Sequence, residues 1–417
     1  MQSIETLVIG AGQAGLATSY YLQQAGREHL VLEREHRAAN TWESGRWDSF
    51  SLVTPNWSFR LPGGEYDGAE PDGFMLRSEI IERFDRYVER HQFPVQTRTR
   101  ATSIEATDLG GYRVLTSNGD FQARNVVMAT GFEQLPRVPA EAGAIPPDVM
   151  QLHSSAYRNP ESLPPGAVLV VGSAQSGAQI AEELYQRGRT VYHSIGSSGR
   201  APRRYRGRDV VDWLLNSIGF FDLPAEKFPA PIEHFAPPHV SGSNGGHTLN
   251  LHQFARDGVR LLGHFRTAAD GQASFAPDMH ECLAKADAFE ARAQQMVDGF
   301  IAANGLDVPN EELPKLEDGF AQPQTETIDL KAEGISSIVW ATGYRSDFTL
   351  VKLPVTDKKG FLLQTNGVSE FPGLYFVGMP WMPSLKTGTL IGMGDHARFI
   401  AEQVVARSKG QSPAQAA

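Results

Sequence analysis

The chain alternates between short apolar runs and stretches in which apolar residues recur at helical spacing. Short apolar runs, which are typical of strands, occur at 6–9, 29–32, 95–99, 112–116, 125–128, 167–171, 190–194, 259–262, 335–340 and 373–377. Helical spacing predicts helices at 16–22, 77–91, 178–186, 284–304 and 395–405. Strands and helices that follow one another in this way predict an α/β fold with parallel sheets.

The first apolar run leads into residues 10–15 (GAGQAG), which open the first helix. Gly10 suits a tight turn, Gly12 lets the backbone approach a pyrophosphate, and Gly15 lets the helix pack closely on the strand. The second run ends in Glu33, eighteen residues after Gly15, and this carboxylate can accept hydrogen bonds from a ribose. The helix start offers unpaired N–H groups to phosphates. This order predicts a dinucleotide-binding unit.

The same pattern returns 162 residues later. The run 167–171 leads into residues 172–177 (GSAQSG), then a helix and a second strand. Ala174 stands where the first unit has its middle glycine, so a methyl group narrows the closest approach to a phosphate. Ser176 offers a hydroxyl at the helix start. The repeat predicts two nucleotide-binding folds, and hence two nucleotides, or one nucleotide and one vestigial unit.

The two units differ in charge after their second strands. The first ends in Glu33, whereas the second ends near Ser194. The following segment holds Ser197 and five arginines, which are Arg200, Arg203, Arg204, Arg206 and Arg208. An acid at this place favours a free 2′-hydroxyl, and arginine favours a 2′-phosphate. We therefore predict FAD at the first unit and NADPH at the second, with NADH as a further option. The alternative is that the arginines form a solvated or salt-bridged face.

Small residues end three further strands. Ala129-Thr130-Gly131 follows the run 125–128, and Ala341-Thr342-Gly343 follows the run 335–340. Gly378 follows the last strand, and a glycine-rich segment at 387–394 precedes the final helix. Such residues let a chain turn sharply beside a bound group, although a single Ala-Thr-Gly is a common turn. A glycine-rich turn before a helix would place N–H groups near the edge of a flavin ring.

Composition limits the class of protein. A chain of 417 residues exceeds one ordinary core, so we expect two domains. The net charge of −10 argues against nucleic acid or an anionic membrane as a partner. The single cysteine, Cys282, excludes an internal disulfide. The chain enters its first strand almost directly and has no run of membrane-spanning length, so we expect a cytoplasmic protein. The oligomeric state stays open, with a homodimer as one option.

The two glycine-rich units and the two Ala-Thr-Gly turns, in this order, resemble the flavin-containing monooxygenases, which are class B flavoprotein monooxygenases. Residues 46–50 (RWDSF), 52–56 (LVTPN) and 205–209 (YRGRD) resemble a bacterial branch of that family. The likeness covers nearly the whole chain. It implies two Rossmann-like, three-layer α/β domains, with the NADPH domain inserted into the FAD domain. The expected FAD-binding domain comprises 1–165 and 326–417, and the NADPH-binding domain, with a helical insertion, comprises 166–325.

The family marker is degenerate in this chain. The pattern Phe-x-Gly-x-x-x-His-x-x-x-Tyr/Phe should precede the second unit, and only its latter half is present, as His153 and Tyr157. Pro147 and Val149 replace the phenylalanine and the glycine. These two replacements, together with Ala174, depart from the pattern of the main monooxygenase branch. They bear more on membership of that branch than on the expected architecture.

The resemblance also implies a chemistry. FAD would lie along the first unit, with Glu33 on its ribose and Trp42 and Trp47 near its middle. NADPH would pass hydride to the flavin, and the reduced flavin would form a C4a-(hydro)peroxide with O2 that oxygenates a small molecule. The family places an asparagine beside the flavin and nicotinamide, and Asn56 is the candidate for this catalytic residue. The alternative is that Pro55 and Asn56 only make a turn. No metal site is predicted.

The implied function is an NADPH-dependent monooxygenase of the N-, S- or Baeyer–Villiger type. The alternatives are an NAD(P)H-dependent flavin reductase or oxidase that inserts no oxygen, and a flavin-binding redox sensor. The predicted cofactor-contacting residues are Gly10, Gly12, Gln13, Ala14, Gly15, Glu33, Arg34, Trp42, Trp47, Ala101, Ala129, Thr130, Gly131, Gly172, Ser173, Gln175, Ser176, Gly177, Ser197, Arg200, Arg203, Ala341, Thr342, Gly343 and Gly378.

Overall fold

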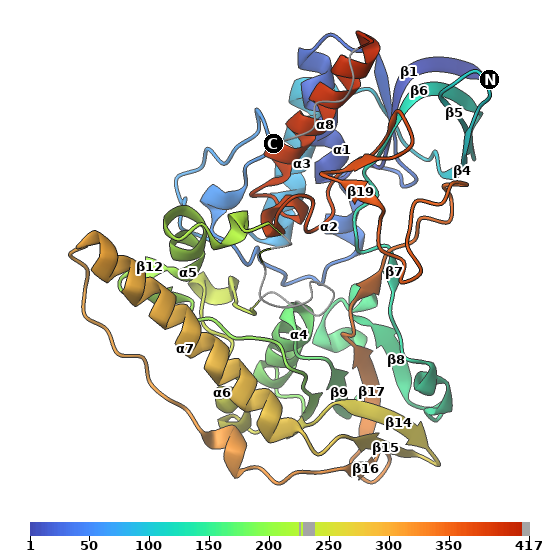
Figure 1. Ribbon diagram of the computed structural model, residues 1–417. Coiled ribbons are helices and arrows are strands. Elements are labelled where there is room, and N and C mark those ends of the chain that lie inside the picture. Colours follow the sequence, from blue (N-terminus) through green and yellow to red (C-terminus); the bar gives the residue numbers. More distant parts are fainter. Residues whose placement is uncertain (225–226, 228–237, 411–417) are drawn as a thin grey trace.

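The computed structural model describes residues 1–224, 227 and 238–410, which build two α/β units (Figure 1). The sheet of the first unit has nine strands. Across its main path they are β19 (Gln364–Thr365), β20 (Val368–Ser369), β21 (Leu374–Phe376), β6 (Phe121–Met128), β1 (Gln2–Ile9), β2 (His29–Leu32) and β3 (Val95–Gln96). The strands from β21 to β3 are parallel. The antiparallel pair β4 (Ala101–Ala106) and β5 (Tyr112–Thr116) joins the sheet through β6.

The first sheet is buried on both faces where its central strands are apolar, which is over Leu7–Ile9 of β1 and Val126–Met128 of β6. In β1, Val8 faces a core that contains side chains of α1 (Gln13–Gln24), α3 (Arg77–His91) and α8 (Met393–Ser408). Leu7 and Ile9 face a second core, which Ile104 of β4 and Val114 of β5 help to form. Since successive strand residues point to opposite faces, the alternation produces three layers of helices, parallel sheet and antiparallel strands.

The second unit repeats this plan. Its five parallel strands run in the order β13 (Arg260–Leu262), β10 (Val191–Ser194), β9 (Ala167–Val171), β17 (Ile335–Trp340) and β8 (Met150–His153). One face packs on α4 (Gln175–Gln186), α6 (Leu251–Arg256) and the long helix α7 (Met279–Asn304). The other packs on the antiparallel strands β14 (Phe265–Ala269), β15 (Gln272–Phe275) and β16 (Thr327–Asp329). The predicted fold of two Rossmann-like, three-layer domains is confirmed.

The pairing of strands moves the boundary between the units. The predicted division assigns residues 150–153 and 335–340 to the first unit, but both segments form strands of the second sheet, where β17 lies between β9 and β8. The chain crosses between the units at β7 (Leu135–Pro136) and β18 (Tyr344–Arg345), which pair with each other. The apolar pattern indicates a strand but not its distant partners, and this is why the division differs.

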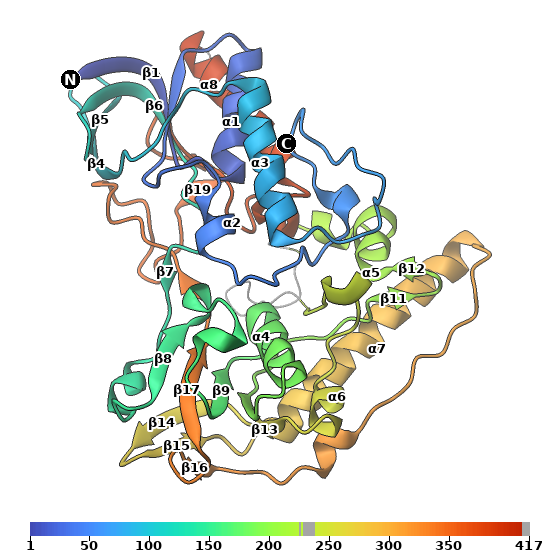
Figure 2. The same ribbon diagram turned by 180° about the vertical axis from the view of Figure 1, so that it is seen from behind.

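The remaining elements lie outside the two main sheets. They are α2 (Asn40–Ser44), the pair β11 (Arg204–Tyr205) and β12 (Arg208–Asp209), α5 (Val210–Asp212) with a π-helical turn at Trp213–Ser217, and short 3₁₀ segments. Figure 2 shows β11 and β12 beside α7 on the lower unit. Among the residues that the structure describes, no helix is both long and apolar enough to cross a membrane.

The first glycine turn (residues 10–15) has one open and two crowded glycines. Gly10 has a φ of 106°, and a Cβ atom there would lie 2.6 Å from the carbonyl oxygen of Ala129. A Cβ atom on Gly15 would lie 1.8 Å from the carbonyl oxygen of Gly10. A Cβ atom on Gly12 would meet nothing within 4 Å. Gly10 and Gly15 are therefore required by packing, whereas the space beside Gly12 is free.

Two fully buried histidines lie under the second glycine turn (residues 172–177). His193 has its Nε2 atom 3.1 Å from the carbonyl oxygen of Gly172. Burial lowers the pKa of His193 to about 4. Burial, with Arg200 and His193 nearby, lowers the pKa of His239 to about 3. Both rings are therefore neutral in the folded protein at neutral pH.

The contrast within the first glycine turn can be tested with two alanine variants. Gly15→Ala should lower the free energy of unfolding by about 3 kcal/mol or more, because the new methyl group collides with backbone. Gly12→Ala should change it by less than about 1 kcal/mol, since its φ of −77° suits alanine. The methyl group should nevertheless weaken retention of FAD. Urea unfolding and the flavin content after gel filtration measure both effects. Equal destabilisation by the two variants would refute the assignment.

The buried histidines predict a loss of stability in mild acid. Their folded-state pKa values lie below the ordinary value of about 6.5, so the unfolded chain binds more protons below that pH. Each histidine should remove about 1.4 kcal/mol of stability per pH unit as the pH falls from about 6.5 towards its folded value. Urea midpoints across this range measure the slope. His193→Gln should flatten it, and the exposed control His36→Gln should not. An unchanged slope in His193→Gln would contradict the prediction.

Candidate functional site

The first glycine turn joins the carboxyl ends of three strands. The N–H of Gly10 donates to the carbonyl of Leu32 at 2.8 Å, at the end of β2. Glu33 follows β2 and is buried, and its Oε2 accepts from the N–H of Ala11 at 3.0 Å. Its Oε1 accepts from the N–H of Glu35 at 2.9 Å. The carboxylate is therefore fixed at the turn, at the place where a nucleotide ribose is expected.

The space beside Gly12 suits a pyrophosphate. No side chain caps the start of α1, so its first N–H groups face that space without a competing acceptor. The N–H of Ala39 donates to the carbonyl of Ala11 at 2.8 Å, which brings α2 against the turn. Asn40, the next residue, has a buried Oδ1 with no hydrogen-bond partner in the described part of the chain. The residues at this turn therefore fit a bound dinucleotide.

Asn40 was not among the predicted site residues. Its signal in the sequence is weak, because an asparagine in an irregular segment more often marks a turn. Only its burial next to the first glycine turn singles it out.

The two predicted tryptophans lie in one aromatic cluster behind α2. Trp42 stacks on Phe84 of α3 with ring centroids 6.2 Å apart. Trp47 is buried and packs edge-to-face on Phe50 at 5.1 Å. Arg46 lies over the ring of Trp42, 5.4 Å from its centroid. The cluster packs residues 42–50 against α3, and its contact with a flavin stays a prediction.

The other predicted residues of the first unit occupy its carboxyl edge and rim. Arg34 is exposed and pairs with Glu35 at 3.2 Å, and Ala101 is half-buried at the start of β4. Ala129 packs on Gly10, while Gln134 donates from Nε2 to the Oγ1 of Thr130 at 2.8 Å and to the carbonyl of Gly131 at 2.7 Å. Residues 129–131 therefore pack against the first glycine turn and are held in place by Gln134.

The C-terminal glycines reach the same place from the other side. A Cβ atom on Gly378 would lie 2.5 Å from the Cβ of Ala14 at the start of α1. Gln13 donates from Nε2 to the carbonyl of Gly388 at 3.3 Å. The start of α1 therefore contacts both the residue that follows the last strand and the glycine-rich segment before α8.

Asn56 is the predicted catalytic residue, and both ends of its amide bind backbone. Its Nδ2 donates to the carbonyl of Glu70 at 2.8 Å, and its Oδ1 accepts from the N–H of Met75 at 2.7 Å. The side chain is buried and fixes the long aromatic loop in a closed shape. This geometry supports the structural alternative, and the catalytic role stays a prediction.

The second glycine turn repeats the contacts of the first. Gly172 has a φ of 105°, and a Cβ atom on it would lie 2.4 Å from the carbonyl oxygen of Ala341. A Cβ atom on Gly177 would lie 1.8 Å from the carbonyl oxygen of Gly172. Ala341 thus stands to Gly172 as Ala129 stands to Gly10. The second Ala-Thr-Gly belongs to the second turn, where no local signal in the sequence could assign it.

Side chains of the second turn bind neighbouring segments. Ser173 accepts at its Oγ from the N–H of Gly196, at 2.9 Å. Gln175 donates from Nε2 to the carbonyl of Val240 at 2.6 Å and accepts from the same residue's N–H at 3.2 Å. Ser176 is half-buried at the start of α4, and Ser197 is exposed after β10. The turn is well formed and lies next to the segment around Val240.

Arg200 is already paired with carboxylates of α7. It is buried, with Nη2 2.6 Å from the Oδ1 of Asp287 and 2.5 Å from the Oε2 of Glu290. Its Nη1 donates to the Oδ1 of Asn250 at 3.3 Å. The side chain is only 5% exposed, so the structure supports the salt-bridged alternative for Arg200.

Arg203 is also paired with a carboxylate inside the protein. It pairs with Asp209, donates to the carbonyl of Val53 at 2.8 Å and lies over the ring of Phe74, 5.0 Å from its centroid. It therefore joins the second unit to the loop of the first. Of the remaining arginines, Arg206 pairs with Asp298 at 2.9 Å, Arg208 pairs with Asp212, and Arg204 is exposed without an ion pair among the described residues.

The predicted turn at 341–343 also marks the crossing between the units. The N–H of Arg137 donates to the carbonyl of Gly343 at 2.9 Å, and Thr342 donates to the carbonyl of Arg137. His153 has Nε2 2.9 Å from the same Gly343 carbonyl, and its ring packs edge-to-face on Tyr344. Burial lowers the pKa of His153. His153, which belongs to the half of the family marker that is present in this chain, therefore lies where the chain crosses between the two units.

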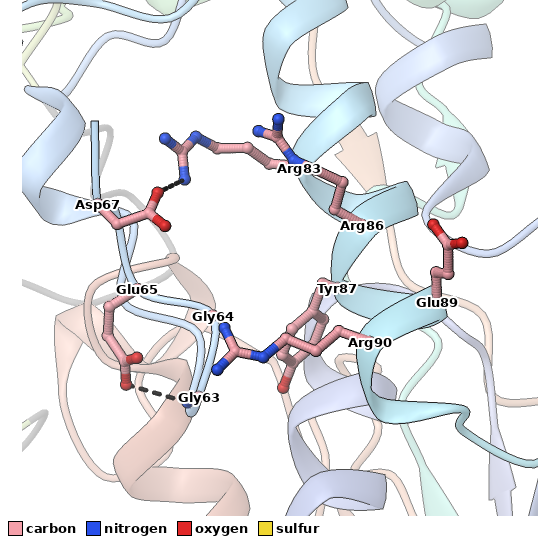
Figure 3. A pocket seen from close by; sticks show the side chains of 9 residues that line it. All are labelled: Gly63, Gly64, Glu65, Asp67, Arg83, Arg86, Tyr87, Glu89 and Arg90. Atoms are coloured by element: carbon pink, nitrogen blue, oxygen red, sulfur yellow. Dashed lines mark hydrogen bonds and ion pairs between the residues drawn. The ribbon is translucent and has the colours of Figure 1, made fainter. Parts of the chain in front are cut away.

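A hollow of about 520 Å³ lies apart from both glycine turns, between the 63–67 loop and α3 (Figure 3). Three arginines and three carboxylates line it with balanced charge, namely Arg83, Arg86, Arg90, Glu65, Asp67 and Glu89. Arg83 pairs across it with Asp67 at 3.0 Å. None of the predicted cofactor residues lines this hollow.

Known proteins that are similar to this chain are oxidoreductases, in agreement with its two glycine turns. The family model for the pyridine nucleotide-disulphide oxidoreductases matches residues 7–214, about half of the chain. An uncharacterized CzcO-like oxidoreductase of Geobacillus kaustophilus is 28% identical over 406 residues, covering 96% of this chain and 98% of that protein. A probable indole-3-pyruvate monooxygenase of Arabidopsis thaliana, YUCCA10, is 29% identical over 212 residues, covering 49% of this chain and 54% of that protein.

A solved structure extends the likeness to the whole fold. The flavin-containing monooxygenase from Stenotrophomonas maltophilia superposes with a TM-score of 0.67 at 20% identity, covering 98% of this chain and 100% of that one. The resemblance read from the glycine turns is confirmed. The chain belongs to the pyridine nucleotide-disulphide oxidoreductase family, has the fold of the flavin-containing monooxygenases, and is an oxidoreductase.

Proposed function

We propose that this oxidoreductase is an FAD- and NADPH-dependent monooxygenase that oxygenates a small molecule at nitrogen or sulfur, or next to a carbonyl. The observation that carries the proposal is the repeated glycine turn, with a φ of 106° at Gly10 and 105° at Gly172 and the same carbonyl contacts in both units. Two turns of one geometry provide places for two dinucleotides. The likeness to flavin monooxygenases supports the choice of FAD and NADPH.

The chain's own residues bind and orient the cofactors. The backbone at Gly12 and the start of α1 would hold the pyrophosphate of FAD, and the fixed carboxylate of Glu33 would accept from its ribose. When bound, the flavin would supply the redox chemistry by which NADPH and O2 add one oxygen atom to the substrate and release the other as water. The protein needs no proton-transfer residue of unusual pKa for this.

Exclusion of water falls to an apolar cluster between the units. It brings together side chains from the loop of the first unit, from residues 210–221, and from the glycine-rich segment before α8. Its buried members are Ala201, Val210, Val211, Leu214, Leu215, Val240 and Ile391, and Trp57 packs against them. An apolar layer at this position would shield the reacting flavin edge and favour an apolar substrate.

Disulfide reduction is disfavoured by the cysteine. Cys282 is 1% exposed, and burial with the nearby carboxylate of Asp278 raises its pKa to about 12. A thiol of this kind is neither reactive nor paired with a second cysteine. The remaining competitor is a flavin reductase or oxidase that transfers electrons without inserting oxygen.

Product analysis separates the two functions. The purified yellow protein should consume about one NADPH per molecule of product, and isotope-labelled O2 should add one labelled oxygen atom to a thioether, a tertiary amine or a ketone. NADPH consumption, hydrogen peroxide release and product mass are measured on the same samples. Steady NADPH oxidation with equal hydrogen peroxide and no labelled product from any of these classes would favour the oxidase.

Asn56 can be assigned by comparing stability with activity. Asn56→Ala removes two buried hydrogen bonds, so we expect it to lower the free energy of unfolding by about 2 kcal/mol and to loosen the aromatic loop. Asn56→Asp keeps the acceptor for the N–H of Met75 but sets a buried carboxylate oxygen against the carbonyl oxygen of Glu70, so it should lose at least as much stability. Urea unfolding and the rate of flavin reduction by NADPH are the measurements. Native stability combined with a large loss of flavin reduction would instead support the catalytic role.

A further inference from the structure

The internal repeat sets the two nucleotide units in register. The N–H of Gly10 donates to the carbonyl of Leu32 at 2.8 Å, and the N–H of Gly172 donates to the carbonyl of Ser194 at 2.9 Å. Each bond joins the start of a glycine turn to the end of the neighbouring strand. From the glycine turn to the end of the second strand, positions in the two units therefore correspond at a spacing of 162 residues.

This register identifies the counterpart of Glu33. The N–H of Glu33 donates to the carbonyl of Gln96 at 2.9 Å, at the end of β3. In the second unit the N–H of Ile195 donates to the carbonyl of Leu262 at 2.8 Å, at the end of β13. Ile195 therefore occupies the position at which the first unit presents its ribose-binding carboxylate, and it is 1% exposed.

The second unit thus needs another residue to contact the 2′-substituent of its nucleotide. Ile195 offers neither an acceptor for a 2′-hydroxyl nor a cation for a 2′-phosphate. Arg200 is held by Asp287 and Glu290, and Arg203 is held by Asp209. The two arginines that were predicted to bind the 2′-phosphate are therefore already paired with carboxylates of the protein.

The pairing of β10 with β13 places a histidine next to the carboxyl end of β10. His264 lies two residues beyond Leu262, just after β13. Its Nε2 is 3.2 Å from the place where a Cβ atom on Gly196 would lie, and Gly196 directly follows Ile195. The absence of a side chain at Gly196 leaves the imidazole beside the carboxyl end of β10. The 2′-substituent of a nucleotide on the second glycine turn belongs at this end of the second strand.

A carboxylate fixes the orientation of this ring. The Oδ2 of Asp278 lies 2.7 Å from the Nδ1 of His264, and its Oδ1 accepts from the backbone N–H of His264 at 3.0 Å. Burial acts to raise the pKa of Asp278, but the hydrogen bonds from His264 outweigh it and lower that pKa. The ionised Asp278 holds Nδ1, so Nε2 is the ring nitrogen that faces Gly196. The side chain of His264 is 47% exposed, so a ligand can reach it.

We propose that His264, positioned by Asp278, binds the 2′-phosphate of the nucleotide on the second glycine turn and sets the preference for NADPH over NADH. The inference rests on the proposed use of NADPH at that turn. In the complex, Nε2–H would donate to a phosphate oxygen, and Asp278 would accept from Nδ1–H. Arg200 and Arg203 are structural in this assignment.

Two fragments that differ by one phosphate provide the test. Adenosine 2′,5′-bisphosphate and adenosine 5′-monophosphate are titrated into the FAD-loaded protein by calorimetry. The wild type should bind the bisphosphate about tenfold more tightly, the size of one charge-assisted hydrogen bond. His264→Ala should abolish this difference while leaving monophosphate binding within about twofold. Asp278→Asn, which keeps the shape of the side chain, should reduce only the bisphosphate affinity.

The outcomes distinguish this inference from the proposed function. Arg204→Ala, which removes an exposed arginine that has no ion pair among the described residues, is the matched control and should keep the tenfold preference. Loss of the preference in Arg204→Ala, with its retention in His264→Ala, would overturn the role of His264 but leave NADPH at the second turn. Equal wild-type affinity for both fragments would also overturn it. Binding of neither fragment would overturn both the inference and the proposed nucleotide site.

Discussion

The whole structure depends on how closely a helix can approach the turn before it. In both units the position that a Cβ atom would take on the last glycine of the turn is only 1.8 Å from a backbone carbonyl oxygen. With glycine there, α1 packs on β1 and α4 packs on β9 without a gap, and the start of each helix comes to the carboxyl edge of its sheet. A larger residue at Gly15 or Gly177 would push the helix outward and remove the place for a phosphate.

Much of this arrangement could be predicted from the sequence because its signals are local. Glycine spacing marks both turns, and uninterrupted apolar runs mark the central parallel strands, since those strands are buried on both faces. The predicted ranges 335–340 and 77–91 coincide with β17 and α3. The strands β14 and β15 were missed because only one of their faces is apolar and they are short.

What could not be predicted depends on contacts between distant residues. Arg200 finds its acids 87 and 90 residues further along the chain, on α7, and nothing near Arg200 announces them. His264 is likewise placed beside Gly196 only by the pairing of β10 with β13. The arginines that follow the second glycine turn in the sequence therefore predicted an NADPH site. Which side chain faces the nucleotide could be inferred only from the three-dimensional structure.

The pair β7 and β18 has a consequence for how such a protein can arise. The chain leaves the first unit at β7 and returns at β18, and these two points are hydrogen-bonded neighbours, with the N–H of Arg137 2.9 Å from the carbonyl oxygen of Gly343. A segment whose ends meet can be added to a host domain without disturbing the host's strand order. The chain between these two points forms the second unit as one continuous segment, and duplication of one nucleotide fold followed by insertion at a single point would produce this topology.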